Sequence, residues 1–330
     1  MVKPILLYCC DFWGCLKQPK NNPIEIFHTL FCKQLLGVRK QTNNVAVLQE
    51  LGLLPLSIHA TKIAMRNWER IHLKNANTLL IASHYDAFEE NLPWTTHVKD
   101  IFSRNGLLET FLSKTDGSDN EGDTETMANV ILQRMVDQYN QTSFGAISAS
   151  SKLHVFNQLK TEPGRETYLS EVEIFKHRRA MTRLRMSSHT LEIERGRWYD
   201  ESHEQDTACQ FCQAFGVKEV EDEAHFLIRC PQFQELRESF LPTSILENQT
   251  MTAEEKMIKI LSDKDSFKSV AKFICQASED RDNTLEVLHT IQDMVKLTEK
   301  SHTISPPNTD SYRIKNTSDD GLKITLARIM

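Results

Sequence analysis

Apolar positions recur at helical intervals through the first part of the chain. From Ile24 to Leu36 they fall on one face and stop at Gly37, so we predict a buried helix. The apolar face of this predicted helix consists of Phe27, Leu30, Phe31 and Leu35. Thr42 and Asn43 can cap a second, short helix that stops near Gly52.

A third helix is predicted from Ile58 to Leu73. Its core face would be Ile58, Ile63, Met65, Trp68 and Ile71. Further helical patterns run over Met127–Tyr139, Tyr168–Met186, Ala253–Leu261, Ser266–Ala277 and Asp282–Lys300, the last of them amphipathic. The hydrophobic pattern therefore predicts a mainly α-helical protein.

Two segments have few side chains to bury. Residues 113–128 are rich in acidic groups and glycine, and residues 301–330 are rich in Ser, Thr, Asn and Pro. We predict an acidic linker in the first and a disordered tail in the second. The expected organisation is a helical segment over 1–112, the linker over 113–128, a helical connector with a metal module over 129–240, a helical tail over 241–300 and the disordered end over 301–330.

Composition limits the function classes. The net charge of −6 argues against a protein coated in basic surface, so contact with nucleic acid would have to be local. No apolar run approaches the roughly 20 residues that span a bilayer. We therefore expect an intracellular chain without a membrane partner, whose nuclear or cytoplasmic location stays open.

Four potential metal ligands follow one another in the pattern C-x2-C-x12-H-x4-C. They are Cys209, Cys212, His225 and Cys230. Two thiolates from one turn, joined by a histidine and a third thiolate, suit tetrahedral zinc, and four protein ligands leave no open position for a reacting water. The sequence therefore predicts one structural Zn²⁺, of the CCHC knuckle kind. Unrelated free thiols, or a redox CxxC pair, are the alternatives.

A basic stretch precedes this cluster in an otherwise acidic protein. It contains Lys176, Arg178, Arg179, Arg183, Arg185, Arg195 and Arg197, with Trp198 next to it. Guanidinium groups could bind phosphates and Trp198 could stack on an unpaired base. The alternative is a solvated face that is balanced by the acidic residues from Glu219 to Glu223.

Two blocks of sequence resemble a known family. The first is PILLYCCDFWG (Pro4–Gly14) with IEIFHTLFCKQLLGV (Ile24–Val38), TNN, ELGLLPL and Trp68, and the second runs from Arg178 through the cysteine cluster to Arg237. Together they resemble the C-terminal region of LINE-type non-LTR retrotransposon reverse transcriptases, downstream of the polymerase palm. The resemblance implies a thumb-like helical segment followed by a zinc-binding module that holds RNA or DNA.

The polymerase carboxylates of that family are missing from this sequence. Tyr85 and Asp86 run into Ala87, so the Tyr-x-Asp-Asp element that would hold the catalytic metal ions is absent. We therefore expect a nucleic-acid-binding remnant rather than an enzyme, with no small-molecule substrate, and expect Met1 to open a fragment. The alternatives are a protein-interaction module that uses the zinc site and the C-terminal amphipathic helix, and a truncated gene model of an active RNA-directed DNA polymerase.

Overall fold

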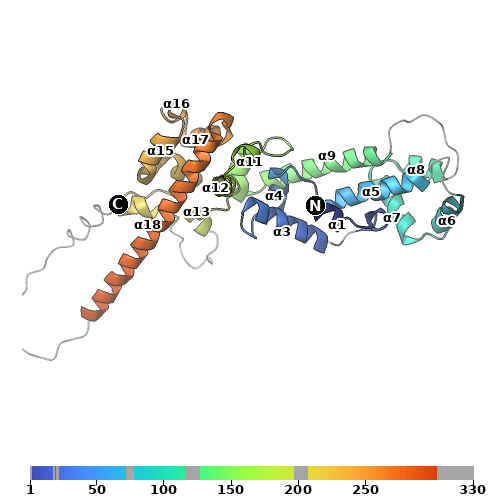
Figure 1. Cartoon of the computed structure of the whole chain (residues 1–330), viewed down its shortest axis with the longest axis horizontal. Coiled ribbons are helices and arrows are strands. Elements are labelled where there is room, and N and C mark those ends of the chain that lie inside the picture. The colour runs from blue at the N-terminus through green and yellow to red at the C-terminus, as the bar shows by residue number, and fades with distance from the viewer. Residues whose placement is uncertain are drawn as a thin grey trace, which may run out of the picture. The chain divides into compact units, whose positions relative to one another are not determined.

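The computed structural model describes residues 2–17, 19, 22–71, 78–115, 127–196 and 207–302. These residues form helices and turns, and no β-strand occurs among them beyond two isolated bridges, so the protein is mainly α-helical as predicted. The chain divides into two compact units. Figure 1 labels the helices along the chain. Unit 1 comprises residues 1–173 and 182–189, and unit 2 comprises residues 174–181 and 190–330.

Unit 1 is built from helices of the first half of the chain. These are α1 (Val2–Leu6), α2 (Cys10–Trp13), α3 (Pro23–Leu36), α4 (Asn44–Glu50), α5 (Leu56–Ile71), α6 (Thr78–Glu89), α7 (Pro93–Arg104), α8 (Leu108–Thr115), α9 (Met127–Ser148), η1 (Ser151–Leu153), α10 (His154–Leu159) and α11 (Tyr168–Glu171). The helix α12 (Phe175–Arg185) contributes its first part to unit 2 and its last part to unit 1.

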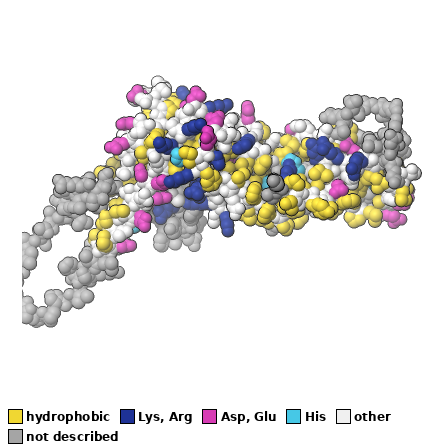
Figure 2. All heavy atoms as spheres, in the orientation of Figure 1, with side chains coloured by type: hydrophobic (Ala, Val, Ile, Leu, Met, Phe, Trp, Pro, Cys, Tyr) yellow, Lys and Arg dark blue, Asp and Glu magenta, His cyan; other side chains and the backbone are white. Residues whose placement is uncertain are grey.

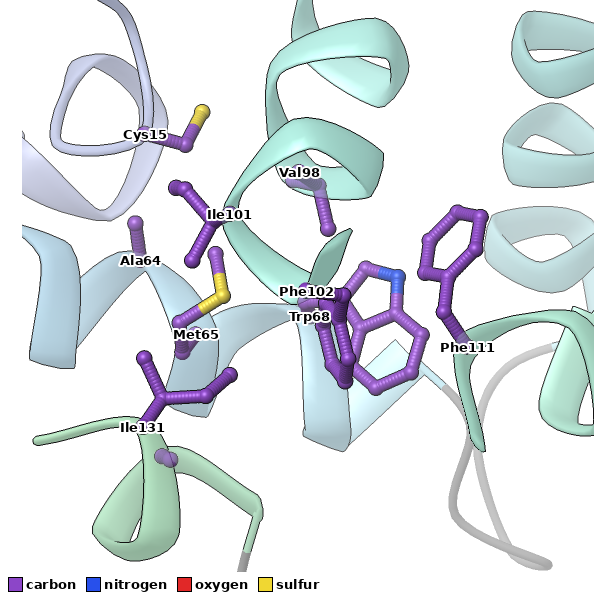
Figure 3. Packing of buried hydrophobic residues seen from close by; sticks show 10 residues of the cluster. Cys15, Ala64, Met65, Trp68, Val98, Ile101, Phe102, Phe111 and Ile131 are labelled. Atoms are coloured by element: carbon purple, nitrogen blue, oxygen red, sulfur yellow. The ribbon is translucent and has the colours of Figure 1, made fainter. Parts of the chain in front are cut away.

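One hydrophobic cluster of unit 1 lies around Trp68 of α5 (Figure 3). The Trp68 side chain is fully buried, with the ring of Phe102 from α7 at 4.6 Å and that of Phe111 from α8 at 5.7 Å, centroid to centroid. Ile131 of α9 belongs to the same cluster. The predicted core role of Trp68 is therefore confirmed, and α9 packs along α5 within unit 1.

The predicted helices at the start of unit 1 form close to their expected positions. Asn43 begins α4, because its side-chain oxygen accepts hydrogen bonds from the backbone N–H groups of Val45 and Ala46. Gly37 ends α3 in the left-handed conformation, with φ of 67°. The side chain of Glu25 accepts hydrogen bonds from the first N–H groups of α5 and so fixes α3 to that helix.

The predicted buried face of α3 is wrong. Phe27 and Leu35 are 51% and 54% exposed, and the buried positions are Thr29, Cys32, Lys33 and Leu36. Because α3 carries apolar side chains on both of these stripes, the pattern alone did not decide which stripe faces α4 and α5. Figure 2 shows hydrophobic side chains gathered at the surface where α3 lies.

Unit 2 contains short elements around one long helix. These are α13 (Glu192–Arg195), α14 (Gln210–Ala214), the π-helical turn η3 (His225–Arg229), η4 (Pro231–Phe233), α15 (Gln234–Phe240), α16 (Thr243–Leu246), α17 (Ala253–Ser262), η5 (Lys264–Ser266) and α18 (Phe267–His302). Neither glycine nor proline interrupts α18, so the two helices predicted over this range are one continuous helix.

The predicted helix from Tyr168 to Met186 is also corrected. It is broken after Glu171, where Val172 is extended, and it resumes at Phe175. The acidic residues 116–126, most of the predicted disordered tail (303–330) and Leu73 lie outside the described residues. A membrane-spanning helix, long and apolar enough for the purpose, does not occur in the described part of the chain.

Candidate metal centre

Cys209 and Cys212, the first two cysteines of the cluster, are positioned by a tight turn in unit 2. The backbone N–H of Cys209 donates to the carbonyl of Glu219 over 2.7 Å, next to an isolated bridge between Ala208 and Val220. The short helix α14 starts immediately after Cys209, so that Cys212 comes round to the same side one turn later. The chain then reverses at Gly216, which has φ of 77°.

His225 and Cys230 are brought together by the π-helical turn η3. The N–H of Cys230 donates to the carbonyl of His225 over 2.8 Å, which is an i to i+5 bond. Pro231 then follows and the chain leaves the turn. In an α-helix the two residues would be about one and a half turns apart, and the wider π turn places them about one turn apart.

The four side chains predicted as ligands meet at one buried point. All four residues are buried, and their ligand atoms lie within 4.8 Å of one another. The Sγ atoms of Cys209 and Cys230 are 3.9 Å apart, and Cys212 Sγ is 3.5 Å from His225 Nε2. Two sulfurs at the usual 2.3 Å from a tetrahedral zinc would be about 3.8 Å apart, and a sulfur and an imidazole nitrogen about 3.5 Å. The group could therefore hold one metal ion, and the cysteines are free thiols rather than disulfides.

The electrostatics of the three thiols are unequal. A hydrogen bond from Cys230 lowers the pKa of the Cys209 thiol to about 4. Burial, followed by the charge on Cys209, raises the pKa of Cys212 to about 11, and the same Cys209 contact raises the pKa of Cys230. A divalent cation coordinated by these atoms would favour all three thiolates and release protons.

Glu219 fixes the orientation of the His225 imidazole. Its Oε2 lies 2.8 Å from His225 Nδ1, so Nδ1–H donates to the carboxylate and Nε2 is left with its lone pair towards the cysteines. Asp222 accepts a hydrogen bond from the backbone N–H of His225 and pairs with Arg229. These two acidic residues therefore support the cluster directly.

Aromatic side chains and a buried ion pair attach the cluster to the rest of unit 2. Phe226 packs on Phe233 and Phe273, with ring centroids at 5.2 and 6.2 Å. Arg281 of α18 forms two hydrogen bonds to Glu221, of 2.7 and 2.6 Å, and one to Glu192 of 3.2 Å. Removal of one partner from such a buried charge group typically costs about 3–5 kcal/mol.

The residues predicted to bind nucleic acid do not form one basic face. Arg185 is buried in unit 1, where its guanidinium pairs with Glu50 at 2.9 Å and with Glu166 at 2.6 Å, so its assignment to a phosphate-binding surface is wrong. Arg183 donates from Nε to the carbonyl of Gly37. Both side chains belong to unit 1 and hold its helices together.

Four further members of the basic set, Lys176, Arg178, Arg179 and Arg195, lie in unit 2. Lys176 pairs with Glu279 at 2.6 Å, and Arg195 pairs with Glu192 at 3.1 Å. The guanidinium groups of Arg178 and Arg179 lie 5.7 and 6.0 Å from the centroid of the Phe175 ring. Arg197 and Trp198 lie outside the described residues.

The acidic residues from Glu219 to Asp222 have partners other than the basic helix. Glu219 contacts His225, Glu221 contacts Arg281 and Asp222 contacts Arg229. These three contacts therefore do not support the alternative in which the acidic residues balance the charge of the basic stretch. Sequence reasoning missed Arg281 and Arg237 as supports of the cluster, because nothing in their spacing distinguishes them from exposed arginines.

Comparison of the chain with models of protein families, with curated proteins and with solved structures finds no match.

Proposed function

We propose that this chain is a zinc-binding, nucleic-acid-binding protein related to the C-terminal region of LINE-type reverse transcriptases, without catalysis of its own. The observation that carries the proposal is the buried Cys₃His group, whose interatomic distances suit tetrahedral zinc. Zinc would be held by Cys209, Cys212, His225 and Cys230, and would serve as a structural ion that fixes the fold of unit 2.

The charge balance around the cluster supports thiolate ligands. Arg237 is buried and donates a hydrogen bond to the carbonyl of Cys230, while burial lowers the pKa of its guanidinium. Three thiolates and one Zn²⁺ carry a net charge of −1. That charge, next to Arg237, would offset the cost of burying the guanidinium.

Nucleic-acid contact would involve the cationic start of α12. Lys176, Arg178 and Arg179 belong to unit 2, as does the metal cluster, and the two arginines are half-buried against the face of Phe175. Guanidinium groups placed in this way can pair with phosphates while keeping their stems packed. The contact would be salt-dependent and largely independent of sequence.

The test is binding of single-stranded RNA and duplex DNA by the full chain, measured by fluorescence anisotropy over a range of salt concentrations. Arg178→Glu together with Arg179→Glu should weaken binding at least about tenfold and lower the salt slope by about 1 to 2. The matched control is Lys259→Glu with Lys264→Glu, which changes the net charge equally at exposed positions elsewhere in unit 2.

Equal losses in the two double variants would show that only net charge matters and would contradict the assignment. Absence of nucleic-acid binding in the zinc-loaded wild-type chain would favour the second candidate, a protein-interaction role. That candidate rests on α18, whose distal part exposes Val287 and Met294. It predicts a partner that is retained on the chain after nuclease treatment.

A further inference from the structure

A pocket in unit 1 lies between α3 and the loop that leads into α4. Its volume is about 440 Å³, within the range of small-molecule sites. The α3 side contributes Ile26, Thr29, Leu30 and Lys33, which follow one another at i, i+3, i+4 and i+7. The opposite side is formed by residues 40–44, namely Lys40, Gln41, Thr42, Asn43 and Asn44.

Lys33 is the unusual member of this pocket. Its side chain is only 6% exposed, and its ammonium donates one hydrogen bond of 2.6 Å to the carbonyl of Lys40. Among the described residues, no carboxylate forms a salt bridge with it, and burial is the cause that lowers the pKa of its ammonium. A buried ammonium has three donors, so one carbonyl acceptor leaves two of them unused. The charge is offset only by partial charges, those of the Lys40 carbonyl and of the C-terminal end of α3, and by no full negative charge of the described residues.

A second buried lysine of unit 1 shows the usual arrangement. Lys160 donates to the carbonyl of Gly164 over 2.6 Å and also pairs with the carboxylate of Glu166 at 2.7 Å. Lys33 has the carbonyl partner and lacks the carboxylate. An anion that enters the pocket would supply this missing partner.

The pocket lining is suited to an anion with an apolar portion. No acidic side chain is among the residues that line it, and Lys40 adds a second positive charge. Asn43 uses its Oδ1 to cap α4, and Gln41 and Asn44 also bring side-chain amides to the lining. Ile26 and Leu30 form an apolar wall that is partly open to solvent.

We propose that this pocket binds the phosphate group of a small phosphorylated compound, with Lys33 as the central charge and Ile26 and Leu30 covering its apolar portion. Lysine is an established point-charge partner for phosphate, and two lysines with several amide donors suit a dianion better than a carboxylate. The proposal does not depend on the zinc site or on the basic start of α12, since the pocket lies in unit 1.

The test is the thermal stability of the full chain in inorganic phosphate, compared with sodium chloride at the same ionic strength. Phosphate should raise the melting temperature by about 2–4 °C, because a ligand that binds only the native state stabilises it. Adenosine monophosphate at the same concentration should give the larger shift, since its base can cover Ile26 and Leu30. An equal shift would overturn the role given to the apolar wall.

Two substitutions separate binding from folding. Lys33→Met keeps the packed stem and removes the charge, so it should leave the unliganded melting temperature unchanged or higher and should abolish the response to both probes. Lys62→Met, on α5 away from the pocket, should keep the wild-type response. No shift in the wild type, or an equal shift in Lys33→Met, would overturn the proposal. Loss of stability in unliganded Lys33→Met together with no response in the wild type would assign Lys33 a structural role only.

Discussion

The carboxylate of Glu219 lies 2.8 Å from the imidazole Nδ1 of His225, on the side opposite the three cysteines. This contact selects the tautomer that presents Nε2 to a metal ion and holds the ring in place. The side chain of Glu219 is 44% exposed, so it contributes little to the core of unit 2. Its main effect should therefore be on metal affinity.

Glu219→Ala should weaken zinc affinity by about 10- to 100-fold, the usual cost of losing such a supporting hydrogen bond. Competition with a chromophoric chelator measures this directly on the full chain. Glu219→Gln keeps an acceptor and should lose less, and Glu235→Ala, an exposed acidic residue of α15, should match the wild type. Zinc affinity that is the same in Glu219→Ala and Glu235→Ala would contradict the role given to Glu219.

The four ligand residues could be predicted from sequence because metal coordination constrains both residue type and spacing. The role of Arg185 could not be predicted in the same way. Seven basic residues in a short stretch look alike in sequence, and only packing reveals that Arg185 faces Glu50 and Glu166 while Arg178 and Arg179 lie on Phe175. Charge density therefore predicted a region and not its individual contacts.

Buried charges connect the elements of unit 1. The Arg185 guanidinium from α12 pairs with Glu50 of α4 and with Glu166 before α11, and Tyr168 donates to Glu50 over 2.6 Å. Glu166, Tyr168 and Arg185 thus share one charge group with Glu50, which precedes Tyr168 by 118 residues in the sequence. A buried carboxylate without a charge partner lowers the stability of the fold, so the loss of one member of this group affects all of the others.

Arg185→Met should destabilise the protein by about 3–5 kcal/mol, because Glu50 would remain buried without its charge partner. Urea unfolding followed by circular dichroism measures the loss. Arg66→Met, an exposed arginine of α5 in the same unit, is the control and should change the unfolding free energy by less than about 0.5 kcal/mol. Similar small changes in both variants would show that the Arg185 pairs do not stabilise the fold.

At the scale of elements, sequence patterns located helices better than their ends and faces. α3 and α4 form near their predicted positions because Gly37 and Asn43 are strong local signals for the end of one helix and the start of the next. The break between α11 and α12 falls at Val172, where neither glycine nor proline marks it in the sequence. α18 is continuous because neither of these residues interrupts it. The π turn at His225 had no signal in the pattern, which describes α-helical periods only.

At the scale of the whole molecule, the mainly α-helical class was predictable and the grouping of helices was not. The sequence predicts residues 129–240 as one connector with the metal module, whereas α9 packs on α4 and α5 within unit 1. The apolar face of α3, formed by Phe27, Leu30, Phe31 and Leu35, was expected to be core and is partly exposed. Periodicity identifies an apolar stripe, and the neighbouring helices decide whether it is covered.

The metal cluster belongs to unit 2, and its supports come from that unit as well. Phe273 and Arg281 of α18 join the cluster to the longest helix through an aromatic contact and a buried ion pair. Without a metal ion, the charge of the buried Arg237 guanidinium would not be offset by coordinated thiolates. The fold of unit 2 should therefore depend on the ion.

The most direct test of the central claim is the metal content of the purified full chain, measured by inductively coupled plasma mass spectrometry. The wild type should carry one zinc per chain, and Cys209→Ser with Cys212→Ser should carry none. Cys9→Ser, at an exposed cysteine outside the cluster, should keep the full amount. A folded wild-type chain without zinc, or zinc that is retained when Cys209 and Cys212 are both replaced, would contradict the assignment of these residues as a structural zinc site.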